Sequence, residues 1–408
     1  MNIHSRTRRS VSIAALVATL VLLAALPSMA GESEDFRFAK RLQNDRMFVA
    51  AAEEYLRFAE KYPASTLRAS AFFSAGESWM QAGRADDALA AFERLLSGYS
   101  DDANACKARF YRGTILKALK QFREAAEELM MIPDLSGGCP LEGRALLEAG
   151  ECLIAAGDPR EAVTVLRRVS DPARYPDQAS RAGYSLAVAL EKSGRDLEAE
   201  KILRETVDRY PDSPVAALSM MKLGDRALDK GEYTEAARYF RKAADDYDEE
   251  SLREKALSKL LEAAEGAGEK ETVLRTSGDY LGLFPAGAGR PRAYELGIYA
   301  ARDRGDRDRA ISMIDSWRKE EGFSDPGGEF SLLRATLLED KGKTREALAE
   351  LKTFRRNYSG SPLLVEAMLL EGALLEKTKE YHDASLRYGI ALAEGASGEE
   401  RLETLERL

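Results

Sequence analysis

Three cysteines are the residues whose type and spacing could do chemistry most directly: Cys106, Cys139 and Cys152. Separations of 33 and 13 residues match no paired-ligand pattern of a zinc site. Cys106 and Cys139 could instead form a disulfide in an oxidising compartment, and Cys152 is expected to be a small buried side chain. The cysteines therefore predict one possible disulfide and no metal site.

The sequence does not favour histidine-based catalysis, because the chain contains only His4 and His382. No HExxH or GxSxG motif occurs, and no glycine-rich phosphate loop follows a strand signal. Carboxylates are plentiful, but a helical surface exposes them everywhere as a solvated face. We therefore expect no catalytic residue, no cofactor and no enzymatic activity.

The composition is that of a folded, acidic protein. Hydrophobic residues make up 45% of the 408 residues and charged residues 32%. There are 60 Lys and Arg against 69 Asp and Glu, which gives a formal charge of −9. Because nucleic acids and anionic lipids require a surplus of basic residues, we expect neither to be a general partner.

The amino terminus has the three-part pattern of a secretory signal peptide. Basic residues 1–10 precede an apolar run at 11–26, and Pro27-Ser28-Met29-Ala30 then supplies small residues before Gly31. Cleavage after Ala30 would release the chain into the periplasm, with no membrane span left. The alternative is a single membrane anchor, although the run is shorter than the roughly 20 residues that a span needs. Arg8-Arg9 leaves general secretion and twin-arginine export both open.

An alanine returns every 37 residues along the rest of the chain, and Val273 occupies the one missing place. Glycine often stands five residues before this alanine, and a large apolar residue often stands four residues after it. Each unit thus predicts a helix, a glycine turn and a second helix, which must stack on its neighbours to bury its apolar face. The alanines are Ala51, Ala88, Ala125, Ala162, Ala199, Ala236, Ala310, Ala347 and Ala384.

These positions resemble the tetratricopeptide repeat (TPR) over residues 32–398, with 37 residues per repeat instead of the family's 34. The sixth repeat carries the resemblance best, with Leu223-Gly224, Gly231, Tyr233, Ala236, Phe240 and Ala243 in the family's order. The resemblance implies an all-α, right-handed α-solenoid of about ten TPR-like helix-turn-helix repeats. The chain is similar to repeat regions of exported bacterial proteins, including the Tol–Pal-associated cell-division coordinator and the β-barrel assembly lipoprotein.

The resemblance also implies a concave groove lined by the first helix of each repeat. The fifth residue of the repeat faces this groove in the family, and eight of the ten repeats have an apolar residue there. Large apolar and aromatic side chains suit a partner-binding surface, but the same stripe could pack against neighbouring helices. The eight residues are Phe36, Phe73, Phe110, Leu147, Tyr184, Met221, Leu332 and Leu369.

Cys106 begins the third repeat and Cys139 ends it. The start of the first helix lies near the end of the second in an antiparallel pair, so a bond between them is geometrically plausible.

Two regions depart from the pattern. The seventh repeat has Leu261, Val273 and Ser277 at its three signature positions, and a segment rich in Pro and Gly follows at 285–291. This pattern favours two interpretations equally. The chain could have a hinge between the repeats at 32–287 and those at 288–398, or it could have an ordinary longer loop there. Residues 399–408 have leucines at three-residue intervals and are predicted to form a capping helix.

These features favour a non-catalytic periplasmic scaffold that binds one or more envelope proteins in its groove, in envelope assembly, division or secretion. An alternative is a peptidoglycan-binding solenoid, similar to the superhelix of lytic transglycosylases without their catalytic domain. A third hypothesis is self-association through the repeat ends, including Leu402, Leu405 and Leu408.

Overall fold

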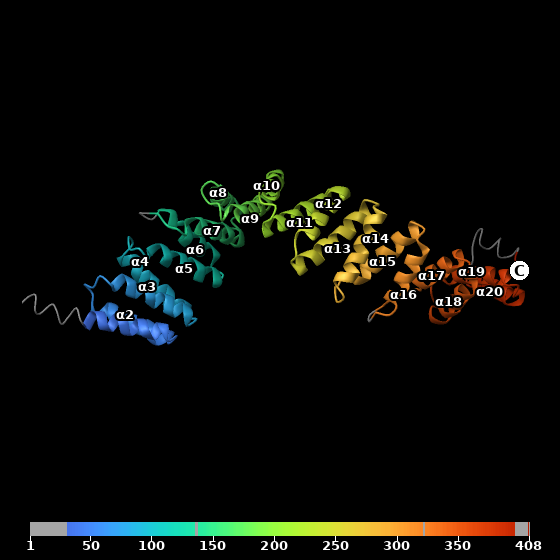
Figure 1. Ribbon diagram of the computed structural model, residues 1–408, viewed down its shortest axis with the longest axis horizontal. Coiled ribbons are helices and arrows are strands. Elements are labelled where there is room, and N and C mark those ends of the chain that lie inside the picture. Colours follow the sequence, from blue (N-terminus) through green and yellow to red (C-terminus); the bar gives the residue numbers. More distant parts are fainter. Residues whose placement is uncertain (1–30, 135–137, 321–322, 396–406, 408) are drawn as a thin grey trace, which may run out of the picture. The chain divides into compact units, whose positions relative to one another are not determined.

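The computed structural model describes residues 31–134, 138–320, 323–395 and Arg407. The predicted signal peptide at 1–30 and nearly all of the predicted cap at 399–408 lie outside these residues. Every regular element of the described part is helical, and no strand occurs in it (Figure 1). The chain divides into two compact units, Met1–Pro211 and Asp212–Leu408, which are described separately.

The first unit contains five antiparallel helix pairs. A short 3-10 helix, η1 (Ile132–Asp134), follows the second helix of the third pair. The first helices are residues 31–44, α3 (Arg68–Gln81), α5 (Ala105–Ala118), α7 (Glu142–Ala156) and α9 (Ala179–Lys192). The second helices are α2 (Phe48–Lys61), α4 (Ala85–Gly98), α6 (Phe122–Met130), α8 (Pro159–Val169) and α10 (Asp196–Arg209).

The second unit also contains five pairs, and each described pair matches one 37-residue repeat. The first helices are α11 (Pro214–Asp229), α13 (Glu250–Gly266), α15 (Arg290–Asp303), α17 (Glu329–Asp340) and α19 (Leu364–Lys377). The second helices are α12 (Tyr233–Asp246), α14 (Lys270–Leu283), α16 (Arg307–Trp317), α18 (Thr344–Asn357) and α20 (Tyr381–Ala393). The predicted all-α helical-repeat fold is confirmed.

The repeated alanine lies in the first turn of each second helix and is buried in every repeat, as is Val273. The large apolar residue four positions later packs against a small residue of the first helix. At Gly76, for example, an added Cβ would lie only 2.4 Å from the Phe92 ring. The same close approach recurs at Gly113, Gly150, Gly224 and Gly372. The repeat pattern therefore records how closely the two helices of a pair pack.

The turn between the two helices has one backbone conformation throughout. The predicted glycines at this place have positive φ angles, between 70° and 89°. Arg46, Lys120 and Lys379 occupy the same place in the first, third and tenth repeats, with φ angles of 60°, 61° and 66°. The left-handed turn is thus retained even where the sequence has no glycine.

The segment after the seventh repeat is held by hydrogen bonds. The Gly289 amide donates to the Tyr280 hydroxyl at 2.9 Å, and the Arg290 guanidinium donates to the carbonyls of Leu281 and Phe284. Arg290 also forms an ion pair with Glu320. A hinge between 287 and 288 stays a prediction.

Candidate protein-binding surface

The predicted groove residues lie on the first helices, and most of them are covered by neighbouring helices. Five are buried: Phe73, Phe110, Leu147, Met221 and Leu332. The other three, Phe36, Tyr184 and Leu369, are partly exposed. This column therefore contributes much of its surface to helix packing, and its role in partner binding stays a prediction.

Aromatic packing in the first unit explains this burial. The Tyr111 ring stacks on Phe73, with centroids 6.0 Å apart, and lies 5.9 Å from Phe92. The Arg144 guanidinium, from the next first helix, covers the Phe110 ring at 4.8 Å. A partner would therefore meet the edges of these rings together with the charged groups above them.

Glu77 is the most unusual of these charged groups. It lies on α3, four residues after Phe73 and hence on the same helical face. Its carboxylate is half-buried, and the described residues supply it with no hydrogen bond. Desolvation raises the pKa of Glu77, while the nearby Lys107 acts in the opposite direction. Burial of a carboxylate costs free energy unless a cation or a hydrogen bond compensates it.

Glu151 shows how the same position looks when it is paired. It stands two repeats later than Glu77, on α7, and accepts two hydrogen bonds of 2.8 Å from the Arg181 guanidinium. Lys117 approaches the same carboxylate at 3.7 Å. Arg181 is the repeat equivalent of Lys107. The acid and the base of neighbouring first helices therefore form a hydrogen-bonded ion pair at Glu151, whereas the described residues show no such pair at Glu77.

In the eighth repeat, the position equivalent to Glu77 is paired within the second unit. Tyr299 on α15 donates a hydrogen bond to Glu329, and burial followed by this bond raises the pKa of Tyr299 well above its usual value. Arg292 contacts Glu265 at 2.6 Å and Glu295 at 2.8 Å.

The sequence prediction missed Glu77, Lys107 and Tyr111 because it followed a single apolar column. The available signal was the spacing of Glu77 from Phe73, which places an acid beside an aromatic stripe.

The cysteines lie in the third and fourth repeats. Cys106 and Cys139 are joined in the structure, with Cα atoms 6.1 Å apart, a separation typical of disulfides. Cys152 is buried in α7, and burial raises the pKa of its thiol to about 11, which makes it an unreactive side chain.

None of the helices within the described ranges combines the length and apolar character that a bilayer crossing demands.

Comparison with known proteins places this architecture in a family. The family profile described as tetratricopeptide repeat matches residues 37–103, 157–214 and 184–251. A search of curated proteins gives no significant match.

The solved structures that match the chain share little sequence with it. A tetratricopeptide repeat protein from Parabacteroides merdae is 16% identical, with a TM-score of 0.41, and the alignment covers 66% of this chain and 98% of that one. Pseudomonas aeruginosa PilF is 16% identical, with a TM-score of 0.40 and coverage of 55% and 95%. MamA is 15% identical, with a TM-score of 0.37 and coverage of 44% and 92%. The profile matches identify these segments as tetratricopeptide repeats, and the repeat sequence and the helix pairs continue the same pattern through the described chain.

Proposed function

We propose that this protein is a non-catalytic, exported scaffold that holds a protein partner against the first helices of its repeats. The observation that carries the proposal is Glu77, a half-buried carboxylate without a hydrogen bond from the described residues. Burying a charge costs free energy unless a partner compensates it, so a Lys or Arg side chain of a bound protein would stabilise this site.

The partner is an extended segment or a helix that lies across α3 and α5. Its cation meets Glu77, and its apolar side chains meet the exposed edges of Tyr111 and its neighbours. The repeat family supports protein binding as the general activity. The basic, apolar and small-residue pattern at 1–30 supports export, so we place the partner in the cell envelope.

The binding experiment uses the mature chain as bait in a periplasmic extract at moderate salt. Glu77→Gln keeps the shape of the side chain and removes its charge, so it should release a partner that the wild type retains. Glu124→Gln is the matched control, because Glu124 is an exposed carboxylate on α6, a second helix. It should bind as well as the wild type.

Equal capture by all three chains would place the binding surface elsewhere. Capture of isolated glycan strands, with no protein retained, would instead favour the peptidoglycan alternative.

Export has its own test. Fractionation of cells that produce the full chain should place the protein in the periplasm, and amino-terminal sequencing should begin at Gly31. A chain that keeps residues 1–30 and sediments with membranes would show that the segment is an anchor.

A further inference from the structure

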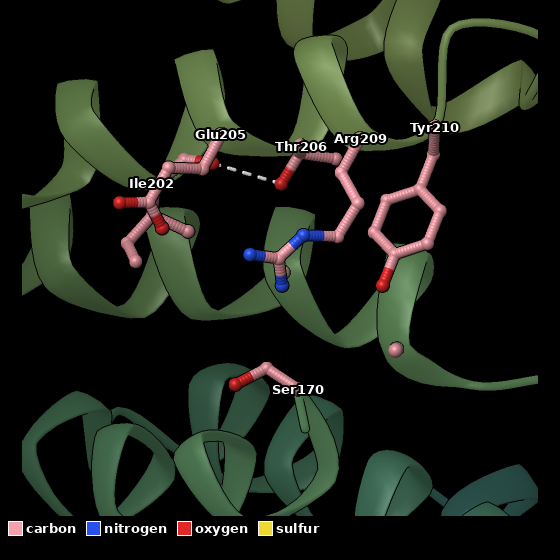
Figure 2. A pocket seen from close by; sticks show the side chains of 8 residues that line it. Ser170, Ile202, Glu205, Thr206, Arg209 and Tyr210 are labelled. Atoms are coloured by element: carbon pink, nitrogen blue, oxygen red, sulfur yellow. Dashed lines mark hydrogen bonds between the residues drawn. The ribbon is translucent and has the colours of Figure 1, made fainter. Parts of the chain in front are cut away.

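A polar pocket lies in the fifth repeat, where α9 and α10 meet the end of α8. Its volume is about 140 Å³, room for several atoms beyond a single water molecule. Figure 2 shows Thr206 and Arg209 of α10 lining it, together with Tyr210 directly after that helix, and Ser170, directly after α8, faces them. Ala179 and Gly183 of α9 complete the lining.

The pocket exists because Gly183 has no side chain. The equivalent position of most other repeats holds a large residue, and only the first and ninth repeats have a small polar one. The equivalents are Asp35, Phe72, Arg109, Leu146, Met220, Leu257, Tyr294, Ser331 and Met368. Gly183 therefore leaves open a place that the other repeats fill.

The first repeat shows what a filled version looks like. There Asp35, the equivalent of Gly183, accepts hydrogen bonds from Lys61 Nζ at 2.7 Å and from the Tyr62 hydroxyl at 2.8 Å. These two bonds, with that from Lys61 the larger influence, hold the pKa of Asp35 below its usual value. A carboxylate at this place is thus bound by a cation and a phenol from the end of the second helix.

The fifth repeat keeps the cation and the phenol but lacks the carboxylate. Arg209 is the equivalent of Lys61, and Tyr210 is the equivalent of Tyr62. The Tyr210 hydroxyl oxygen is buried and finds no hydrogen-bond partner in the described chain. Arg209 is exposed and forms no ion pair there. Two groups that bind Asp35 in one repeat are therefore present and unused in the other.

The ninth repeat also places a carboxylate beside the equivalent tyrosine, and this carboxylate comes from a loop. Tyr358, the equivalent of Tyr210, has its hydroxyl 3.4 Å from Asp325 Oδ2. A carboxylate accordingly meets this tyrosine in two repeats, and from two different positions of the chain.

We propose that the pocket at Gly183 binds a carboxylate of a second molecule, an acidic side chain of a protein partner. The carboxylate takes the place of Asp35, accepts a hydrogen bond from the Tyr210 hydroxyl and pairs with the Arg209 guanidinium. Glu205 also lines the pocket, but its carboxylate is oriented toward Lys201, 3.8 Å away. That the carboxylate belongs to a protein rests on the proposed scaffold function.

The direct test uses small probes in place of a partner. Calorimetric titration of the full mature chain compares N-acetyl-glutamyl-amide, which has only a side-chain carboxylate, with N-acetyl-glycine, which has only a terminal one. Propionate tests a small carboxylate without any peptide backbone, and N-acetyl-glutaminyl-amide is the uncharged control. We expect saturable binding of the glutamyl probe with a dissociation constant on the order of 1 mM, as for a single small contact, and none of the glutaminyl probe.

Variants assign this binding to the pocket. Tyr210→Phe and Arg209→Gln should each weaken the glutamyl probe about tenfold, because each removes one hydrogen bond to a charged group. Gly183→Asp should abolish binding by supplying the carboxylate from within, whereas Gly183→Asn adds the same volume without the charge. An added Cβ at this place would lie 2.7 Å from Thr206 Oγ1 in both variants, so their difference isolates the charge.

Gly183→Asp should also unfold at a higher temperature than Gly183→Asn, and this difference should vanish when Arg209→Gln is added. The proposal would be overturned if the wild type showed no saturable binding of the glutamyl probe. It would also be overturned if Tyr210→Phe bound the probe as well as the wild type. The second outcome keeps the proposal testable even if the Gly183 variants do not fold. Preference for N-acetyl-glycine or propionate would overturn the assignment to an acidic side chain. Glu77→Gln should bind the probe as the wild type does. This variant therefore distinguishes a failure of the proposed binding surface at Glu77 from a failure of the proposed carboxylate pocket at Gly183.

Discussion

The sixth and seventh repeats build the same helix pair from opposite choices of side-chain size. In the sixth, Gly224 lies against the buried ring of Phe240, and an added Cβ would stand 2.6 Å from that ring. In the seventh, the equivalent places hold Leu261 and Ser277, both buried. The large and small members of the pair have exchanged helices.

This exchange shows that the repeat conserves filled volume more strictly than it conserves residue type. The neighbouring helix α15 also lies close to Ser277, since an added Cβ at Gly297 would stand 2.9 Å from the Ser277 Cβ. A repeat that departs from the family at two positions can therefore keep the fold, because the second departure compensates the first.

The largest predicted effect comes from breaking only one half of the pair. Phe240→Ser should lower the free energy of unfolding by about 4 kcal/mol, because it removes a buried ring and leaves a cavity. Adding Gly224→Leu should then recover more than half of that loss, as in the natural seventh repeat. Urea unfolding of the wild type, both single variants and the double variant gives the coupling between the two positions.

If the two changes are merely additive, compensation between the positions is not the reason that the seventh repeat folds. Phe92→Ser with Gly76→Leu in the second repeat is a matched control, since Gly76 packs on Phe92 in the same way.

The same comparison explains what could be predicted from the sequence. The nine alanines and the glycine turns located every helix pair, because each serves a local need, close packing or a left-handed turn, that few residues meet. Leu261 and Ser277 looked like two separate defects when each position was considered alone. Their compensation depends on contact across two helices, which a column of single residues does not display.

The candidate sites have a similar limit. Glu77 and Gly183 each stand in a column whose members vary in type from repeat to repeat. Their interest comes from a missing hydrogen bond: the described residues supply none to the Glu77 carboxylate and none to the Tyr210 hydroxyl. A missing contact has no sequence pattern of its own, so these sites became visible only when equivalent repeats were compared in three dimensions.

The second prediction concerns the residue three positions after Ser277. The sixth repeat has the buried Ala243 at the equivalent place, whereas the Tyr280 hydroxyl donates to Glu254 at 2.7 Å and accepts from the Gly289 amide. Tyr280→Phe should lower the free energy of unfolding by about 2 kcal/mol, because both partners lose a hydrogen bond. Urea unfolding at neutral pH measures this loss, and Tyr381→Phe, which changes an exposed ring, is its control.

The third prediction follows from the proton of the same hydroxyl. Burial, aided by the bond to Glu254, raises the pKa of Tyr280 to about 12, above the value near 10 expected in the unfolded chain. The folded state therefore keeps this proton at a pH where the unfolded state has lost it, so stability falls as the pH rises from about 10 to 12. Tyr280→Phe should show a smaller fall over this range. An unchanged slope would mean that Tyr280 titrates normally in the folded chain.

The fourth prediction tests the feature that both repeats retain. Gly231 and Gly268 have φ angles of 73° and 70°, and in each turn the next amide bonds back across the helix end, from Glu232 to Ala227 and from Glu269 to Ala264. Gly231→Ala and Gly268→Ala should each cost about 1 kcal/mol, because a side chain disfavours this conformation. Unequal costs in thermal unfolding would show that the two turns are not equivalent.

The smallest effect is expected where the seventh repeat departs from ideal packing. The Ser277 hydroxyl is buried and has no hydrogen-bond partner within the described chain, which makes it a polar atom held at a cost. Ser277→Ala removes that oxygen and keeps the Cβ beside Gly297, so it should raise the free energy of unfolding by up to about 1 kcal/mol. Ser219→Ala is the control, because the buried Ser219 hydroxyl donates to the Val215 carbonyl at 2.8 Å and its loss should give no gain. Destabilisation by Ser277→Ala in urea would show that the hydroxyl is bonded after all, and that the seventh repeat gains from the serine itself as well as from its small size.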